Sequence, residues 1–375
     1  MTRYRDLGLT VGQLSPGPLN GITDVSGVRV GVSTLIRGGG PLIRGQGPIR
    51  TGVTVIVPTE RIGRHVVFAG CHRLNGNGEV TGLEWVRESG VLSTPIAITN
   101  THSVGVVRDA LVAHDVATHE GHDSFWSLPV VGETYDGGLN DINGFHVRPE
   151  HVDAALEAAS GGPVPEGNVG GGTGMICHEF KGGTGSASRI VGNYVVGALV
   201  QANHGRRERL SVDGVPVGRE ISTSEVPSAW DEEERVTKAG AGSIIVVLAT
   251  DAPLLPHQLD RVAQRAGLGV ARAGGGGEHS SGDIFLAFST ANVGSLNSYK
   301  LESEGNAPVE ISMLLDTEIT PLFWAAIEAT EEAIFNALVA AETLTGRDGI
   351  TGYALPHDRL VEIMTRYSRG PAENR

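Results

Sequence analysis

Short apolar runs rich in β-branched residues recur along the chain, and their glycine and proline borders predict strands rather than helices. The predicted strands cover residues 53–57, 95–99, 194–200, 243–250 and 283–289. In residues 210–217 an Asp-Gly pair stands between two apolar segments, which predicts a hairpin with a tight turn. The apolar pattern therefore indicates a large β component.

Helical spacing and helix-boundary residues predict four helices, at residues 103–119, 149–159, 256–266 and 321–344. We expect the third helix to end at Gly267. The fourth has Thr320 as its predicted N-cap and Gly346 beyond its end, and its apolar stripe predicts a buried face. Because strands and helices do not alternate regularly, the pattern favours a layered α+β fold over a doubly wound sheet.

Composition and charge narrow the class of protein. Of the 375 residues, 40% are hydrophobic and 19% are charged, and no apolar run is long enough to span a membrane. We therefore expect a globular protein without a membrane partner. The net charge of −14 argues against a nucleic-acid partner. The first residues show no secretory signal, which predicts a cytoplasmic location.

Cysteine and glycine usage bears on cofactors. Cys71 and Cys177 are far apart in the sequence and are predicted to be buried, reduced thiols. The glycine-rich residues 169–174 and 181–185 contain no phosphate-binding motif, so we interpret them as tight turns packed near the site. We expect no metal and no organic cofactor.

The candidate chemistry lies at the junction of a glycine-rich stretch, residues 238–242, with the apolar run that follows. If the chain breaks between Gly242 and Ser243, Ser243 carries both a hydroxyl nucleophile and a free α-amine with an ordinary pKa of about 7.7 to 8. Residues 224–239, which include a short charged run, are predicted to be an exposed linker that moves away after cleavage.

Residues 241–256 resemble the self-cleaving serine peptidases of the P1 family, the L-aminopeptidase/D-amino-acid esterase-amidases and β-peptidyl aminopeptidases. The resemblance extends in family order through residues 17–25, 74–79, 133–137, 139–144, 169–175 and 281–292. It implies a four-layer αββα sandwich that resembles N-terminal-nucleophile hydrolases but differs from them in connectivity. It also implies a single domain, residues 1–375, which cuts itself into fragments 1–242 and 243–375, and a homotetramer.

The resemblance assigns roles to individual residues. Ser243 matches the nucleophile at the cleavage point, and Asn203 matches the residue that stabilises the oxyanion; from the residues alone, Asn203 is a turn asparagine. Ser281 and Asp283, two apart on one strand face, match the pair that orients the new amine, although a capping serine and an edge aspartate remain the alternative. Glu133 matches an acid that binds the substrate amine, with a surface ion pair as its alternative.

The function implied is a hydrolase that releases N-terminal residues from short peptides, amides or esters that have a free amine. Where the α-aminopeptidase type carries an aromatic residue, this chain has Gly138, which predicts a wider pocket. The choices between α- and β-amino substrates and between L and D configuration stay open. Two alternatives remain: an acyl transferase resembling the ornithine acetyltransferases, which use an N-terminal threonine, and a non-enzymatic protein that binds a small molecule.

Overall fold

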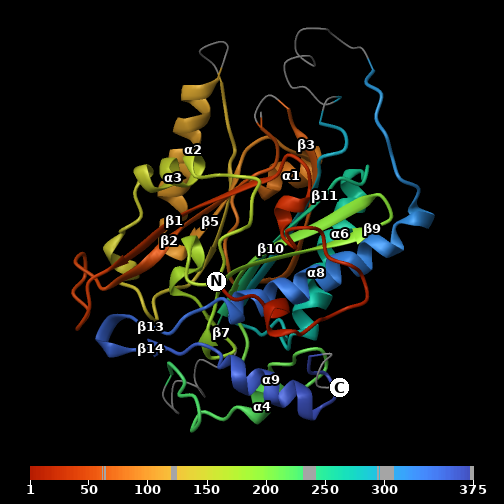
Figure 1. The fold of residues 1–375 in the computed structure, drawn as a ribbon. Helices are drawn as coiled ribbons and strands as arrows, with labels where there is room; N and C mark the ends of the chain where they lie inside the picture. Colours follow the sequence, from red (N-terminus) through yellow and green to blue (C-terminus); the bar gives the residue numbers. More distant parts are fainter. Residues whose placement is uncertain are drawn as a thin grey trace.

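A computed structural model describes residues 1–60, 62, 65–119, 125–230, 242–293, 295 and 308–371. Two β-sheets form its centre (Figure 1). The smaller sheet has four strands in the order β1-β2-β5-β6, which span Arg29–Arg37, Ile49–Val57, Ile96–Asn100 and Val130–Thr134. Its pairs are antiparallel except β5 and β6, which are parallel.

The larger sheet has six strands in the order β4-β3-β12-β11-β10-β9. In that order they span Val91–Leu92, Val67–Gly76, Ser281–Ser289, Gly242–Thr250, Tyr194–Asn203 and Gly183–Val191. Strands β11 and β12 run parallel to each other, and every other neighbouring pair is antiparallel. The strand that begins at Gly242 therefore lies near the middle of the sheet.

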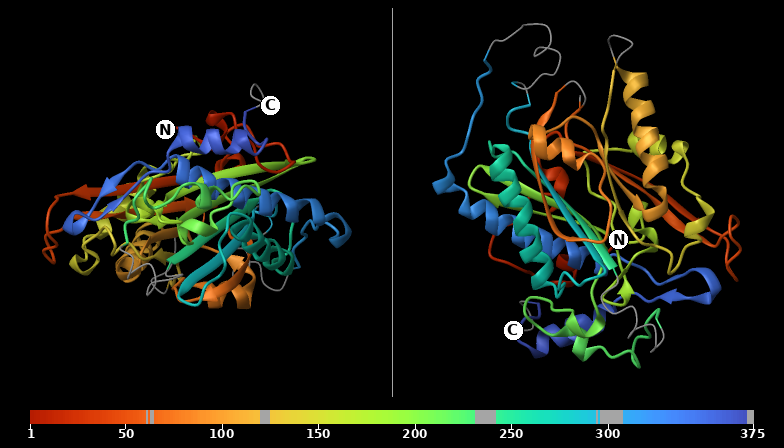
Figure 2. Two further views of the ribbon diagram at one scale, coloured as in Figure 1. Left: turned by 90° about the horizontal axis from the view of Figure 1, so that it is seen from below. Right: turned by 180° about the vertical axis from the view of Figure 1, so that it is seen from behind.

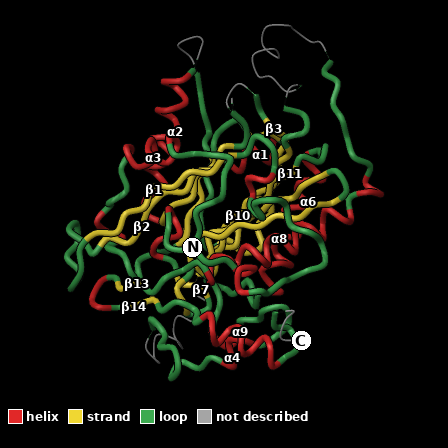
Figure 3. The backbone as a smooth tube through the Cα atoms, in the orientation of Figure 1, coloured by secondary structure: helices red, strands yellow, loops and turns green. Residues whose placement is uncertain are grey.

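Helices cover the outer face of each sheet (Figures 1 and 3). The α-helices α1, α2, α3, α4, α6, α8 and α9 span Leu83–Ser89, Val104–Thr118, Pro149–Glu157, Val217–Glu220, Pro256–Arg272, Thr320–Val339 and His357–Arg366. Helices α2 and α3 lie against the smaller sheet, and α6 and α8 lie against the larger one, as the rear view also shows (Figure 2).

The two sheets and the helices on their outer faces form four layers, and an apolar core lies between each pair of adjacent layers. Val246 and Leu248 of β11 pack with α6 and α8, whereas Ile245 and Val247 of the same strand pack between the two sheets. The third core joins the smaller sheet to α2 and α3. Because β11 is buried on both faces, its sequence is a continuous apolar run. The predicted αββα sandwich is confirmed.

Two predicted helix ends are wrong. Helix α6 continues through Gly267 to Arg272, and at Gly269 it approaches α8 so closely that a Cβ would lie 2.6 Å from the carbonyl oxygen of Ile327. Helix α8 ends at Val339, before the predicted end at 344. The Asn168 amide bonds both the N–H and the carbonyl of Glu342, which holds that segment outside the helix.

The remaining elements are short. The hairpin predicted in residues 210–217 forms a single bridge between Val212 and Val215, and both turn residues between them have positive φ. Strands β7, β8, β13 and β14 span Ile176–Cys177, Phe180–Lys181, Leu344–Thr345 and Thr351–Gly352. Turns of 3₁₀ helix lie at Tyr4–Leu7, Ile22–Asp24, Thr101–Ser103, Ile142–Gly144, Gly170–Gly174, Arg207–Arg209, Asp316–Glu318 and Arg347–Gly349. Among the described residues, no helix combines the length and apolar character needed to cross a bilayer.

Candidate active site

Ser243 is the second residue of β11 and lies between two neighbouring strands. It stands opposite Asn203 in the antiparallel pair with β10 and beside Gly282 in the parallel pair with β12. Side chains alternate along a strand, and Ile245 packs between the sheets, so Ser243 points toward the smaller sheet. Its side chain is buried, which places the hydroxyl in a site that largely excludes water.

The hydroxyl of Ser243 contacts the carbonyl group that precedes it. Ser243 Oγ donates to the carbonyl oxygen of Gly242 at 2.6 Å and accepts the N–H of Gly282 at 3.2 Å. A Cβ on Gly242 would lie 2.5 Å from the carbonyl oxygen of Asn203, so only glycine fits there without a shift of the backbone. The rest of the predicted hinge, residues 238–241, lies outside the described residues, as does most of the predicted linker.

Asn203 is the last residue of β10 and both ends of its amide are engaged. Its Oδ1 accepts the N–H of Ile176 at 2.8 Å, and its Nδ2 donates to the carbonyl of Tyr135 at 3.0 Å. An amide nitrogen carries two hydrogens, so one Nδ2 hydrogen remains for a ligand. Because Asn203 pairs directly with Ser243, its side chain is on the same face of the sheet as the hydroxyl.

Ser281 and Asp283 share one face of β12, as the spacing predicts. Ser281 Oγ donates to Asp283 Oδ1 at 2.6 Å, and both side chains are buried. In the parallel register they lie beside Gly242 and Ile244, on either side of Ser243. Burial raises the pKa of Asp283, while hydrogen bonds from Ser281 and from the backbone N–H of Ile244 oppose the rise. The pair therefore flanks the backbone of Ser243 rather than its hydroxyl.

Glu133, on β6, is buried, so the surface ion pair considered as its alternative does not apply. Its carboxylate accepts the N–H of Glu79 at 3.0 Å and the hydroxyl of Thr101. Burial raises the pKa of Glu133, and these two donors oppose the rise. A Cβ on Gly78 would lie 3.2 Å both from Glu133 Oε1 and from the Cα of Gly282, so Gly78 packs against both the carboxylate and the residue that bonds Ser243 Oγ.

Sequence reasoning missed the groups that hold these side chains in place. The carbonyl of Tyr135 and the N–H of Ile176 orient the Asn203 amide, but backbone groups leave no signature in a sequence. Asp136 supports the turn that carries Tyr135, because its carboxylate accepts the amides of Asn100 and Asn140, each at 3.0 Å. Burial raises the pKa of Asp136 to about 6.

The pocket at Gly138 is not widened in the way that the sequence predicted. The indole of Trp230 fills this space: a Cβ on Gly138 would lie only 2.4 Å from Trp230 Cη2. The ring comes from the described part of the predicted linker, residues 224–230, far from Gly138 in sequence. An aromatic group from another segment therefore occupies the space that the glycine leaves.

Comparisons with known proteins agree on one family. The model of peptidase family S58 matches residues 20–352. The β-peptidyl aminopeptidase BapA of Sphingosinicella microcystinivorans is 50% identical, over 98% of this chain and 93% of that protein. The structure of a Burkholderia sp. β-aminopeptidase superposes with a TM-score of 0.89 at 52% identity, over 97% of this chain and 99% of that one.

A second solved structure bears on the fold class. The L-aminopeptidase D-Ala-esterase/amidase of Ochrobactrum anthropi, described as a variant of the Ntn hydrolase fold and a prototype of the serine aminopeptidases, superposes with a TM-score of 0.87 at 45% identity. The match covers 98% of this chain and 99% of that one. The layered architecture described above is thus similar to that variant.

Proposed function

The chain belongs to peptidase family S58 and is a serine aminopeptidase, and from this premise we propose that it matures by cutting its own Gly242–Ser243 bond. The observation that carries the proposal is the contact of Ser243 Oγ with the Gly242 carbonyl, 2.6 Å from its oxygen. The hydroxyl attacks the carbonyl carbon, and the acyl group of Gly242 moves from the nitrogen of Ser243 to its Oγ, which forms an ester. Water then hydrolyses the ester, which leaves a Gly242 carboxylate and a free Ser243 amine.

Turnover uses the same atoms on a substrate. Ser243 Oγ attacks the substrate carbonyl while its α-amine accepts the hydroxyl proton, and the amine then gives this proton to the leaving group. Water then hydrolyses the acyl-enzyme: the amine accepts a proton from the attacking water and returns it to Ser243 Oγ. The position of Asn203 opposite Ser243 supports its role as donor to the oxyanion, where one good donor contributes about 3 to 4 kcal/mol.

Two acidic groups serve different amines in this proposal. The Ser281–Asp283 pair holds the α-amine of Ser243, because the pair flanks the backbone from which that amine is released. Glu133 binds the ammonium group of the substrate. Its carboxylate is buried near Gly282, and a buried carboxylate strongly favours a cationic partner.

For the substrate we propose peptides and amides that begin with a β-amino acid. The support is the names of two relatives at 50% and 52% identity, a β-peptidyl aminopeptidase and a β-aminopeptidase. A panel of L-α-, D-α- and β-aminoacyl p-nitroanilides tests this choice, and turnover of the L-α series alone would contradict it. The acetyl-transfer and binding-protein alternatives have no support from the family match, which is to peptidases.

Mass spectrometry of the denatured protein tests maturation. We expect two species, residues 1–242 and 243–375, in active wild-type protein. Ser243→Ala should give a single full-length species without activity, whereas the exposed control Ser222→Ala should be cut like wild type. Fully active protein that consists only of uncut chain would refute the proposal.

We also propose that the chain forms a homotetramer. An extended segment before α8 supports it, because alternate apolar side chains of this segment face solvent: Val309, Ile311, Met313 and Leu315, 42–62% exposed. The amide of Asn292 bonds both backbone groups of the intervening Ser312, which holds the segment on the surface. Native mass spectrometry gives the stoichiometry directly, and a monomer at micromolar concentration would contradict the proposal.

A further inference from the structure

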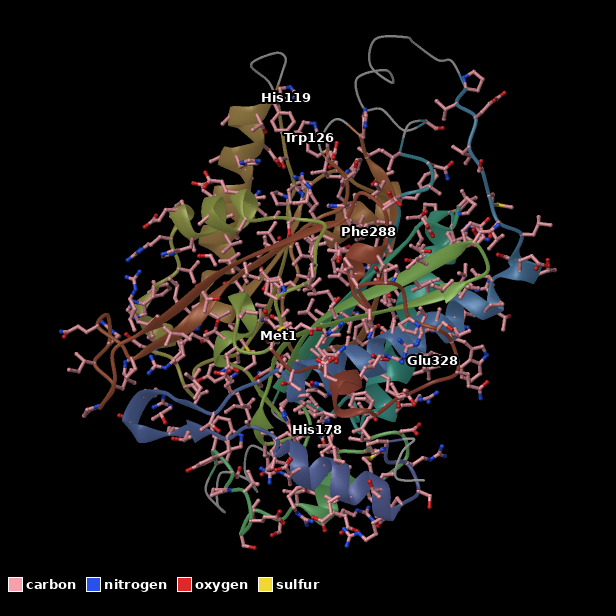
Figure 4. All side chains as sticks on the ribbon, viewed as in Figure 1. Met1, His119, Trp126, His178, Phe288 and Glu328 are labelled. Atoms are coloured by element: carbon pink, nitrogen blue, oxygen red, sulfur yellow. The ribbon has the colours of Figure 1, made fainter. Side chains whose placement is uncertain are left out.

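Three buried side chains with metal-ligating atoms gather at the end of β10, on the side of the larger sheet that faces α6. They are Cys177 of β7, His178 and His204, and one ligating atom from each lies within 4.8 Å of the others. The Sγ of Cys177 is 3.8 Å from Nδ1 of His204, and the two imidazole rings are 5.1 Å apart between centroids. In Figure 4, His178 lies toward the end of the molecule that carries α9. Phe288, near the last residue of β12, lies toward the opposite end.

The two imidazoles leave polar atoms without partners in the interior. Nε2 of His178 and Nε2 of His204 are both buried and have no hydrogen-bond partner. Nδ1 of His178 lies 2.9 Å from the carbonyl oxygen of Arg206. A carbonyl oxygen only accepts, so Nδ1 carries the hydrogen and Nε2 presents an unpaired lone pair. This is the arrangement of metal-binding histidines, whose second nitrogen usually donates to a carbonyl or carboxylate.

The backbone around the cluster is shaped to place His178 there. His178 and Glu179 both have positive φ, 48° and 61°, which is uncommon for residues other than glycine. The N–H of His178 donates to the carbonyl of His204 at 2.7 Å, which joins the β7–β8 turn to the end of β10. A Cβ on Gly205 would lie 2.3 Å from His178 Cε1, so the imidazole needs a glycine beside it.

We propose that Cys177, His178 and His204 bind one zinc-type transition-metal ion. A thiolate with two imidazoles suits Zn²⁺ and excludes Mg²⁺ or Ca²⁺, which prefer oxygen ligands. Tetrahedral Zn²⁺ sets its sulfur and nitrogen ligands roughly 3.3 to 3.6 Å apart. The 3.8 Å between Cys177 Sγ and His204 Nδ1 is close to this separation, and the ligating atom of His178, within 4.8 Å of the other ligating atoms, has to move by at most about 1.5 Å. On binding, the thiol loses its proton to solvent.

One buried cationic side chain that acts on Cys177 does not occupy the site. Lys181, also buried, directs its ammonium group to the carbonyls of Met175 and Gly182, at 2.9 and 2.7 Å. The ion is separate from the proposed chemistry, because the ring of His204 lies on the helix side of the larger sheet. A Cβ on Gly275, after α6, would be 3.0 Å from His204 Cδ2 and 2.5 Å from Val270 Cγ1 of α6. The role of the ion is structural: it clamps the β7–β8 turn to β10, behind the Asn203 amide.

Cobalt(II) substitution tests the proposal on the full chain. Protein purified without metal is given one equivalent of Co²⁺, and bound metal is measured together with the absorption spectrum. We expect one Co²⁺ per chain and a thiolate-to-cobalt charge-transfer band, which one equivalent of Zn²⁺ abolishes. Wild-type protein that binds no Co²⁺, or binds it without this band, would overturn the proposal; a water molecule between the imidazoles would give that result.

Matched variants identify the ligands. Cys177→Ser should lose the band, and His178→Gln should bind Co²⁺ at least tenfold more weakly. The control Cys71→Ser removes the other buried free thiol, which lies on β3, and should keep both band and stoichiometry. Zn²⁺ should raise the Tm of wild type and of Cys71→Ser but not of Cys177→Ser. Loss of the band in Cys71→Ser with retention in Cys177→Ser would refute the assignment.

Discussion

Replacing Glu133 by glutamine removes a charge from the site while keeping the shape of the side chain. In the structure the carboxylate accepts an N–H from Glu79 and a hydroxyl from Thr101. A glutamine keeps its carbonyl oxygen for the N–H, and its amide nitrogen donates to the threonine oxygen, which also accepts. The fold and self-cleavage should therefore survive, and only the proposed attraction for the substrate ammonium is lost.

The size of the effect follows from the burial of this group. A hydrogen bond to a charged group contributes about 1.5 to 3 kcal/mol, and this range applies to Glu133 because its burial limits screening of the charge by water. At 1.36 kcal/mol for each tenfold change, kcat/KM for aminoacyl p-nitroanilides should fall about 10- to 150-fold in Glu133→Gln. A p-nitrophenyl ester that lacks the amine should be hydrolysed at nearly the wild-type rate.

The ratio of the two activities is the informative measurement, because it cancels differences in the amount of active enzyme. Glu79→Gln is the matched control: its backbone N–H still reaches Glu133, but its own carboxylate is exposed, so the ratio should stay near that of wild type. Mass spectrometry should show equal cleavage in all three proteins. An unchanged ratio in Glu133→Gln would refute the assignment of ammonium binding to this residue.

Three further predictions follow from the described contacts. Asn203→Ala should lower kcat about 10²- to 10³-fold per cleaved chain, and a loss under tenfold would exclude it as the oxyanion donor. Gly269→Ala should destabilise by about 1 to 3 kcal/mol in urea unfolding, because its Cβ would lie 2.6 Å from the Ile327 carbonyl. Gly105→Ala in α2, where nothing lies within 4 Å, should stabilise by about 0.5 to 1 kcal/mol; equal effects would contradict this reasoning. Because burial raises the pKa of Glu133, its charged form is lost on acidification at a higher pH than for an ordinary glutamate. For amine substrates, the fall in kcat/KM caused by protonation of Glu133 should therefore occur at a higher pH than an ordinary glutamate would give. This fall should be absent in Glu133→Gln, whereas the fall caused by protonation of the Ser243 amine should remain.

The sequence predicted the buried strands well because their pattern is local. The runs at 243–250 and 283–289 became β11 and β12 nearly residue for residue, since strands buried on both faces need continuous apolar side chains. The ends of α6 and α8 depend on long-range contacts, such as the approach of Gly269 to α8, and were placed wrongly. The αββα order came from the family resemblance, because periodicity alone supports only a layered α+β fold.

In the candidate site, too, the sequence predicted the local features and missed those that depend on long-range contacts. The spacing of Ser281 and Asp283 was enough to predict that they share a face, because alternation is a property of one strand. The groups that orient Asn203 are backbone atoms of segments far away in sequence, which no pattern of side chains reports. For the same reason the sequence missed that Trp230 fills the space at Gly138.

The order of strands in the larger sheet has a consequence for the two halves of a cut chain. Apart from Gly242, strands β11 and β12 come from residues after the proposed cut, yet they are inserted between β10 and β3, which come from before it. Neither polypeptide alone contains all the strands of the larger sheet, so separating the two would disrupt this sheet and unfold the protein. If the proposed cut occurs, we therefore expect it to follow folding, and halves produced from separate genes should assemble only by folding together.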